Sequence, residues 1–354
     1  MILPERYALV IGGAGFIGTN LSHALAEEGR SVLVFDNLSR TGVQANLDWL
    51  LRKHPRELVF MHGDVRDPDA VREAVSKATV VFHLAAQVAV TCSVEDPVTD
   101  FEINSRGTLN VLEAIRRAPT RIPIIFTSTN KVLGTLEHIR LTEYETRYEP
   151  TDAKIRLNGV GDEDGIAFCS PYGCSKGAAD QYVLDYARTF GLQTLVFRMS
   201  CIYGPHQCGN EDQGWVAHFV KRAIAGEPIT FYGNGKQVRD ALFVGDLITA
   251  FMLGWKKINE LSGRVFNIGG GPSHTISLIE LVSLLSNLQQ RSVSIRYDDW
   301  RPSDQRYYVS DTSKYTAATG WRPLVDVPAG VEQLFHWLKG PRTGSKEALK
   351  QLTA

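Results

Sequence analysis

Short hydrophobic runs recur along the first part of the chain, and each is too short to form a buried helix. They are rich in β-branched residues and apolar at successive positions, as expected of strands that are covered on both faces of a parallel sheet. The predicted strands are Tyr7–Ile11, Ser31–Phe35, Leu58–Met61, Val80–Leu84, Ile122–Thr127 and Thr194–Met199.

Longer segments separate these runs, and their apolar residues recur at helical spacing on one face. The predicted helices are Phe16–Glu28, Val43–His54, Asp69–Lys77, Val98–Arg117 and Tyr172–Phe190. Strands that alternate with helices in this way predict an α/β fold, built on a Rossmann-type, doubly wound parallel sheet.

The pattern changes after Gly204, where Gly and Pro become more frequent and the strand candidates become shorter. These later elements are Ile229–Tyr232, Arg264–Ile268, Val293–Tyr297 and the helix Ser277–Leu288. They predict a smaller, substrate-binding lobe that is interleaved with the first domain. The predicted division is a main domain over residues 1–204, the lobe over 205–340 and a polar tail over 341–354.

Composition and charge narrow the class of protein. The 354 residues carry a formal net charge of −1 and no basic block, which argues against a nucleic-acid partner. The chain has no apolar stretch of membrane-spanning length, and its first apolar run is too short for a signal peptide. Five cysteines without CxxC spacing argue against a disulfide framework or a zinc site. We therefore expect a cytoplasmic protein with no metal and no membrane contact.

A glycine-rich turn follows the first predicted strand and opens a helix, with the sequence Gly12-Gly13-Ala14-Gly15-Phe16-Ile17-Gly18. Such a turn lets backbone N–H groups and a helix N-terminus approach a pyrophosphate. The second strand leads to Asp36, whose carboxylate can accept hydrogen bonds from both ribose hydroxyls and would repel a 2′-phosphate. This arrangement favours NAD over NADP, although Arg40 lies nearby and can accept a phosphate.

Residues at the ends of the next two strands extend the predicted NAD site over the domain 1–204. Asp64 is placed to cap the adenine amino group, and the small residues of Leu84–Gln87 allow the cofactor to pass closely. The predicted cofactor-binding residues are Gly12, Gly15, Phe16, Ile17, Gly18, Asp36, Asn37, Ser39, Arg40, Asp64, Val65, Leu84, Ala85, Ala86, Gln87, Tyr172 and Lys176.

Candidate catalytic residues lie at the start of the helix Tyr172–Phe190. Tyr172 and Lys176 are four residues apart and therefore share one helix face. We expect the ammonium, together with a nicotinamide charge, to lower the tyrosine pKa, so that Tyr172 can take a proton from a hydroxyl as hydride leaves the same carbon. Ser128 and Thr129 follow the fifth strand and supply hydroxyl groups for the reacting oxygen.

In combination, the glycine turn, the strand-end hydroxyls and the YxxxK sequence resemble the extended short-chain dehydrogenase/reductase family over nearly the whole chain. Four segments resemble the CDP-paratose 2-epimerase group within it, namely Ser128–Val132, Asn158–Glu163, Ser170–Tyr182 and Asp212–Trp215. The resemblance implies an isomerase that oxidises C2 of CDP-paratose to a transient 2-keto sugar. The ketone is then reduced from the opposite face to give CDP-tyvelose, while NAD stays bound.

Other activities stay open at this point. A UDP-sugar 4-epimerase needs only the residues Thr129, Tyr172 and Lys176, and the same residues would serve a net oxidoreductase that releases NADH. A non-catalytic NAD-binding protein is disfavoured because all three are present. A sugar-nucleotide 4,6-dehydratase needs an acid and a base after the threonine, where this chain has Asn130 and Lys131.

Substrate contacts are predicted mainly from the resemblance. Asn130 follows Thr129, and Cys201 stands where many relatives have an asparagine, although buried packing is an equal alternative. Arg239 and Arg301 are candidates for the diphosphate because the guanidinium fork matches phosphate oxygens. Their alternative is an ion pair with Asp240 or Asp304.

Two further features bear on the assembly of the site. The acidic, loop-like insertion Leu136–Phe168 is hypothesised to be a lid over the sugar, with a peripheral hairpin as the alternative. Leu133 replaces the aromatic residue that the family usually has before Gly134. The helices predicted over Val98–Arg117 and Tyr172–Phe190 suggest a four-helix contact between subunits, and therefore a homodimer or homotetramer.

Overall fold

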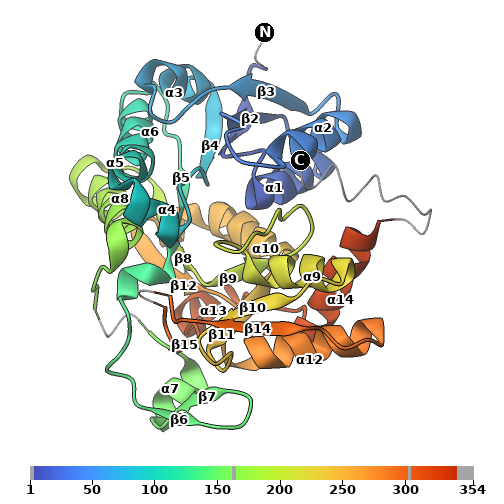
Figure 1. Cartoon of the computed structure of the whole chain (residues 1–354). Coiled ribbons are helices and arrows are strands. Elements are labelled where there is room, and N and C mark those ends of the chain that lie inside the picture. Colours follow the sequence, from blue (N-terminus) through green and yellow to red (C-terminus); the bar gives the residue numbers. More distant parts are fainter. Residues whose placement is uncertain (1–3, 162–164, 302–303, 341–354) are drawn as a thin grey trace.

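The computed structural model describes residues 4–161, 165–301 and 304–340, and its centre is a seven-stranded sheet (Figure 1). The strand order is β12-β8-β5-β4-β1-β2-β3, and every neighbouring pair is parallel. This order confirms the predicted doubly wound Rossmann fold. The strands are β1 Tyr7–Ile11, β2 Val32–Asp36, β3 Leu58–His62, β4 Ala78–His83, β5 Ile124–Thr129, β8 Thr194–Met199 and β12 Arg264–Ile268.

Helices cover both faces of the sheet and bury its apolar strands in two layers of core. One layer contains α1 Phe16–Glu27, α2 Val43–Lys53 and α10 Val244–Lys256, with α11 Ile258–Leu261 and α13 Ser313–Thr319. The other layer contains α3 Pro68–Val75, α6 Gly107–Arg116 and α8 Ser170–Phe190. None of the described helices is long and apolar enough to cross a bilayer.

The helix predicted over Val98–Arg117 is confirmed as one run of helical backbone from Pro97 to Arg116, but it contains a π-helical turn that was not predicted. The segment consists of α5 Pro97–Phe101, a π-helical turn η1 Glu102–Arg106, and α6, and it follows the short helix α4 Val90–Glu95. Pro97 begins α5 behind Asp96, whose side chain accepts a hydrogen bond from the Thr99 backbone. Single π-helical turns inside α-helices are frequent at functional sites, and this one carries the buried side chain of Asn104.

The lobe consists of small sheets and the helices around them, below the main sheet in Figure 1. β11 Val238–Phe243 pairs with β9 Cys201–Tyr203, β13 Thr275–Ser277 and β15 Tyr307–Tyr308, while β10 Ile229–Tyr232 pairs with β14 Ile295–Asp298. The surrounding elements are α9 Trp215–Ala225, α12 Leu278–Gln289, α14 Val327–Lys339 and the 3-10 turn η3 Pro272–His274. The chain returns from this lobe to add β12 to the main sheet. The predicted tail 341–354 lies outside the described residues.

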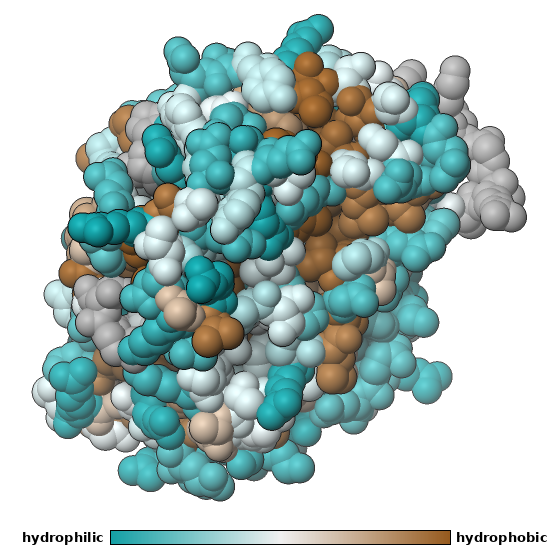
Figure 2. Space-filling view, turned by 90° about the horizontal axis from the view of Figure 1, so that it is seen from below, coloured by the Kyte–Doolittle hydropathy of each residue, from teal (hydrophilic) through white to brown (hydrophobic). Residues whose placement is uncertain are grey.

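The insertion is folded and not a structureless loop. It contains the hairpin β6 Leu141–Glu143 and β7 Tyr148–Pro150, followed by α7 Ala153–Asn158, at the bottom of Figure 1. Arg147 binds Glu280 of α12 at 2.6 Å, so the hairpin is fixed to the lobe. The lower face on which it lies carries mostly hydrophilic side chains (Figure 2). Residues 162–164 lie outside the described part, and with them part of the resemblance segment Asn158–Glu163.

Candidate active site

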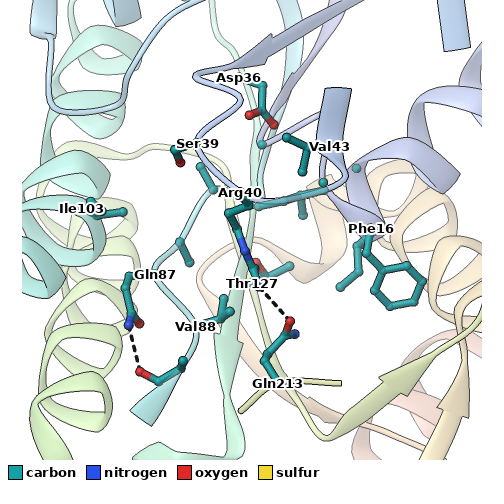
Figure 3. Close-up of a pocket in the computed structure, with 18 of the residues that line it drawn as sticks. Phe16, Asp36, Ser39, Arg40, Val43, Gln87, Val88, Ile103, Thr127 and Gln213 are labelled. Atoms are coloured by element: carbon teal, nitrogen blue, oxygen red, sulfur yellow. Dashed lines mark hydrogen bonds between the residues drawn. The ribbon is translucent and has the colours of Figure 1, made fainter. Parts of the chain in front are cut away.

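A cavity of about 540 Å³ opens at the carboxyl ends of the central strands, where doubly wound sheets bind their ligands. Every residue predicted to bind the cofactor lines this cavity, and so do Ser128, Thr129 and Asn130. Figure 3 shows some of the lining residues, among them Phe16, Asp36 and Gln87. The other three predicted substrate residues, Cys201, Arg239 and Arg301, are not among the lining residues. No described residue between 136 and 161 lines the cavity either, so the hairpin does not border the predicted NAD site, and the lid over the sugar stays a hypothesis.

The glycine turn is packed so closely that side chains cannot replace its hydrogens. Gly12 has φ +80°, and a Cβ there would lie 2.6 Å from the backbone nitrogen of Ala85. A Cβ on Gly18 would collide with the carbonyl oxygen of Gly12. Gly15 caps α1 without a side-chain hydrogen bond. The N-terminus of α1 therefore presents backbone N–H groups to the cavity, which fits a pyrophosphate.

Asp36 is fixed at the end of β2 by two backbone groups. Its Oδ1 accepts a hydrogen bond from the nitrogen of Leu38 at 2.9 Å, and its Oδ2 accepts one from Ala14 at 3.1 Å. Burial raises the pKa of this carboxyl group, and the backbone hydrogen bonds oppose that effect. The carboxylate lines the cavity next to the turn, where a ribose diol attached to the pyrophosphate would lie.

Asp64 lies beside Asp36 at the end of β3. Its Oδ2 accepts a hydrogen bond from Asn37 at 2.8 Å, and Arg66 forms a two-pronged contact with the same carboxylate. The Arg66 hydrogen bonds hold the pKa of Asp64 well below its usual range. The group is therefore an ionised acceptor at the predicted adenine end of the cavity.

Arg40 connects the two parts of the molecule across the cavity. Its Nη2 donates a hydrogen bond to Oε1 of Gln213 at 2.9 Å (Figure 3). Arg40 belongs to the loop after β2, whereas Gln213 belongs to the lobe loop before α9. Sequence reasoning considered Arg40 only as a phosphate ligand and missed this contact. The sequence pointed to Gln213 only through the segment Asp212–Trp215, which resembles the corresponding segment of the CDP-paratose 2-epimerase group.

Tyr172 and Lys176 both project from the first turns of α8 into the cavity wall. Burial raises the pKa of Tyr172 to about 12, and the nearby Thr129 hydroxyl opposes the shift. Nζ of Lys176 donates to the carbonyl oxygen of Thr127 at 2.6 Å and lies over the Phe126 ring. Burial is therefore the largest influence on the tyrosine pKa, and the expectation that the Lys176 ammonium and a nicotinamide charge together lower it stays a prediction.

Lys176 itself is strongly affected by its surroundings. Burial lowers its pKa to about 7, and the carboxylates of Asp180 and Asp100 oppose the shift. The side chain is only 3% exposed. Near neutral pH it can therefore either keep or release its proton at the floor of the cavity.

A buried polar network supports the catalytic helix and was not predicted. Asn104, from the π-helical turn, accepts a hydrogen bond from the Gln87 nitrogen at 3.0 Å and donates to Ser175 Oγ at 3.0 Å. Ser175 in turn donates to Asp100. The network joins α8 to the Leu84–Gln87 loop, and its members carry no local sequence signal because they meet only in the folded chain.

The residues after Thr129 form a second polar group in the 3-10 turn η2 Asn130–Leu133. Nδ2 of Asn130 donates to Oε1 of Gln305 at 3.1 Å, and Nζ of Lys131 lies 3.5 Å from the same oxygen. Burial lowers the pKa of Lys131 to about 8. Next to Thr129 the chain therefore places an amide and an amine, where a dehydratase needs an acid and a base.

The remaining candidate substrate residues have partners in the lobe. Arg239 forms an ion pair with Asp304 at 2.7 Å, which is the alternative that the sequence left open. Arg301 donates to the Glu211 carbonyl at 2.8 Å and lies over the Tyr232 ring. Sγ of Cys201 accepts a hydrogen bond from Trp215. Their contact with a substrate stays a prediction.

Comparisons with known proteins agree with this geometry. The chain is 44% identical over 339 residues to a CDP-paratose 2-epimerase of Salmonella typhi. The aligned region covers 93% of this chain and 98% of the relative. The crystal structure of a Thermotoga maritima UDP-glucose 4-epimerase with UDP-glucose is 29% identical, with a TM-score of 0.80 over 94% of this chain and 98% of that one. The Thermus thermophilus UDP-glucose 4-epimerase complex with NAD is 32% identical, with a TM-score of 0.77 over 95% and 99%.

The family model described as GDP-mannose 4,6 dehydratase matches residues 9–334, which is most of the chain and includes both the glycine turn and the lobe. The matched residues include the strands of the Rossmann sheet and the Tyr172–Lys176 pair. The chain belongs to this family of extended short-chain dehydrogenases/reductases.

Proposed function

We propose that this protein is an NAD-dependent epimerase that inverts C2 of a CDP-activated sugar and converts CDP-paratose into CDP-tyvelose. The observation that carries the proposal is the set Thr129, Tyr172 and Lys176 in the wall of the dinucleotide cavity, followed by Asn130 and Lys131. This set supports oxidation and reduction of a carbinol but supplies no carboxylic acid after Thr129 for dehydration. The similarity to a CDP-paratose 2-epimerase over nearly its whole length supports the choice of substrate.

The residues of the cavity fit NAD. The N-terminus of α1 would hold the pyrophosphate, Asp36 the adenosine ribose, and the wall around Leu84–Gln87 the remainder. When bound, NAD supplies a hydride acceptor and a positively charged ring beside the substrate.

Tyr172 is the proposed base for the carbinol proton. In the resting protein its pKa of about 12 keeps it protonated, so it needs additional positive charge nearby to act as a base at neutral pH. Thr129 lies next to it and can hold the reacting oxygen through a hydrogen bond. The Ser128 hydroxyl is buried without a protein partner and is also available to that oxygen.

Lys176 has a positioning role in this scheme. Its ammonium is held by the Thr127 carbonyl, at the end of the strand that carries Ser128 and Thr129. It therefore fixes the end of β5 relative to the first turns of α8, and its charge lies at the floor of the same cavity. Loss of the lysine would disturb both the hydroxyl groups and the tyrosine.

A UDP-sugar 4-epimerase is the second candidate. Solved UDP-glucose 4-epimerases share the fold over nearly the whole chain, and the same three residues suffice for C4 chemistry. We favour C2 chemistry because the identity to the 2-epimerase is higher than the identity to these 4-epimerases.

The proposal is tested by incubating the purified protein separately with CDP-paratose, UDP-glucose and UDP-N-acetylglucosamine, without added NAD. Sugar proton couplings are followed by NMR. Inversion at C2 of CDP-paratose supports the proposal and shows that NAD is retained through purification. Inversion only at C4 of a UDP-sugar would assign the protein to the second candidate.

A further inference from the structure

A cluster of metal-ligating side chains lies outside the cavity, where α1 packs against the end of α2. His23 and Glu27 are four residues apart and therefore share one face of α1. His54 is the first residue after α2 and packs against them. Among the residues that the structure describes, these three offer a nitrogen, a nitrogen and an oxygen within 4.8 Å of one another.

The distances between the three ligand atoms match a metal site. Nδ1 of His23 lies 2.7 Å from Nε2 of His54, and Oε1 of Glu27 lies 3.9 Å and 3.6 Å from these two nitrogens. Bonds of about 2.0–2.1 Å in a tetrahedral zinc site place neighbouring ligand atoms about 3.3 Å apart. The observed separations lie on both sides of that value, so small side-chain rotations would complete the geometry.

A hydrogen bond between the two histidines accounts for their contact but leaves the nearby Glu27 carboxylate outside it. Two imidazole nitrogens at 2.7 Å share at most one proton, and the Glu27 oxygen is beyond hydrogen-bond distance from both. A divalent cation at the centre would engage both nitrogen lone pairs and the carboxylate charge together. Two histidines with one carboxylate is a ligand set that zinc uses with one position left for water.

The surroundings leave that fourth position accessible. The His54 side chain is only 7% exposed, and His23 packs against the edge of Trp49. The Glu27 side chain is 56% exposed, so the cluster is closed on the protein side and open to solvent on the other. Solvent can therefore deliver the ion and supply its remaining ligand.

We propose that His23, Glu27 and His54 bind one divalent cation of the zinc class, with water in the open position. The ion would fix α1, which begins at the glycine turn, to the end of α2. The expectation of a chain without metal rested on cysteine spacing and did not consider the His-x-x-x-Glu pattern on a predicted helix. The site is independent of the proposed epimerase activity.

The experiment measures Zn²⁺ binding by calorimetry on chelator-treated full-length protein, with Co²⁺ absorption as a second readout. His23→Ala and Glu27→Gln test the site, because both side chains are partly exposed and their loss should not prevent folding. The matched control is the double variant Glu332→Gln/His336→Ala, which removes an exposed pair of the same spacing at 3.6 Å on α14.

We expect one Zn²⁺ per chain in the wild type and in the control. Each test variant should weaken binding by at least about tenfold, a loss that even second-sphere changes produce at metal sites. Co²⁺ should give the spectrum of nitrogen and oxygen ligands. Equal Zn²⁺ binding by the wild type and both test variants would overturn the proposal. So would a cobalt-thiolate absorption band, because it would assign the ion to the cysteines.

Discussion

At the scale of single residues, burial is the dominant influence on the catalytic pair. It raises the pKa of Tyr172 to about 12 and lowers the pKa of Lys176 to about 7, so at neutral pH the tyrosine is protonated and the lysine is near the midpoint of its titration. A positive charge placed near Tyr172 would oppose the effect of burial and favour the phenolate. This makes the chemistry dependent on a filled site.

Replacing Tyr172 by Phe should lower turnover of the nucleotide sugar by about 10²–10⁴-fold, the usual contribution of a positioned acid or base. Bound NAD should be retained, because the ring still fills its place in the cavity wall. The measurement is NMR turnover together with the NAD content of the purified variant. Tyr182→Phe is the control, since that side chain is 46% exposed on the same helix. Turnover within a few-fold of wild type in the Tyr172 variant would remove this residue from the mechanism.

Lys176 predicts a pH dependence of folding stability. Its pKa is about 7 in the folded protein against an ordinary value of 10.5, so the unfolded chain binds the extra proton between these values. The cost of burying the ammonium is complete below pH 7 and declines as the pH rises. NAD-free wild type should therefore gain stability relative to Lys176→Met by about 1 kcal/mol per pH unit above neutrality. Urea unfolding of both proteins between about pH 6 and pH 9 measures this difference, and a constant difference would contradict the assignment.

At the scale of elements, the cavity is built where loops from two parts of the molecule meet. The loop after β2 carries Arg40, the loop before α9 carries Gln213, and their hydrogen bond crosses the opening. His206, from the same lobe loop, packs on Trp49 of α2 with ring centroids 4.3 Å apart. These contacts therefore join the lobe to the main domain at the wall of the cavity.

Gln213→Ala should release NAD faster without changing the chemistry. A hydrogen bond of this kind contributes about 1 kcal/mol, which corresponds to roughly fivefold faster release. Stopped-flow displacement of bound NAD measures the rate. Gln44→Ala is the control, because Gln44 bonds only Asp48 on the exposed face of α2. An unchanged release rate would show that the Arg40–Gln213 contact does not hold the cofactor.

Comparison of the elements with the sequence patterns shows which parts of the site could be predicted from the sequence. The glycine turn, Asp36 and the Tyr172–Lys176 pair are recognised from local sequence patterns, and all of these residues but Gly13 and Ala14 line the cavity. Asn104 and Gln305 escaped prediction because their partners are distant in the chain, and a π-helical turn breaks the periodicity that predicted one helix. The position of the hairpin could not be predicted either, because contacts such as Arg147–Glu280 are equally non-local.

At the scale of the whole molecule, one flank carries exposed apolar side chains. Val98 is 69% exposed and Phe101 50% exposed on α5, and α5 and α8 lie side by side at the left of Figure 1. Exposed apolar groups gathered on packed helices are typical of a subunit interface. We propose that α5 and α8, with their copies in a second chain, form the contact of a homodimer or a dimer-based tetramer.

Phe101→Glu should convert that assembly into monomers, because it places a charge in the apolar contact. Light scattering after size-exclusion chromatography gives the mass of each species. Leu324→Glu is the control, as Leu324 is 83% exposed elsewhere on the surface. A wild-type protein that is monomeric at micromolar concentration would contradict the proposed interface.

The central claim is that one carbinol is oxidised and re-reduced by the same bound cofactor. The most direct test is CDP-paratose carrying deuterium at C2, incubated in ordinary water with the protein as purified. The account predicts CDP-tyvelose with the deuterium retained at C2, no exchange into NAD added from solution and no NADH released. Loss of the label to solvent, or NADH formed in proportion to the sugar consumed, would contradict it.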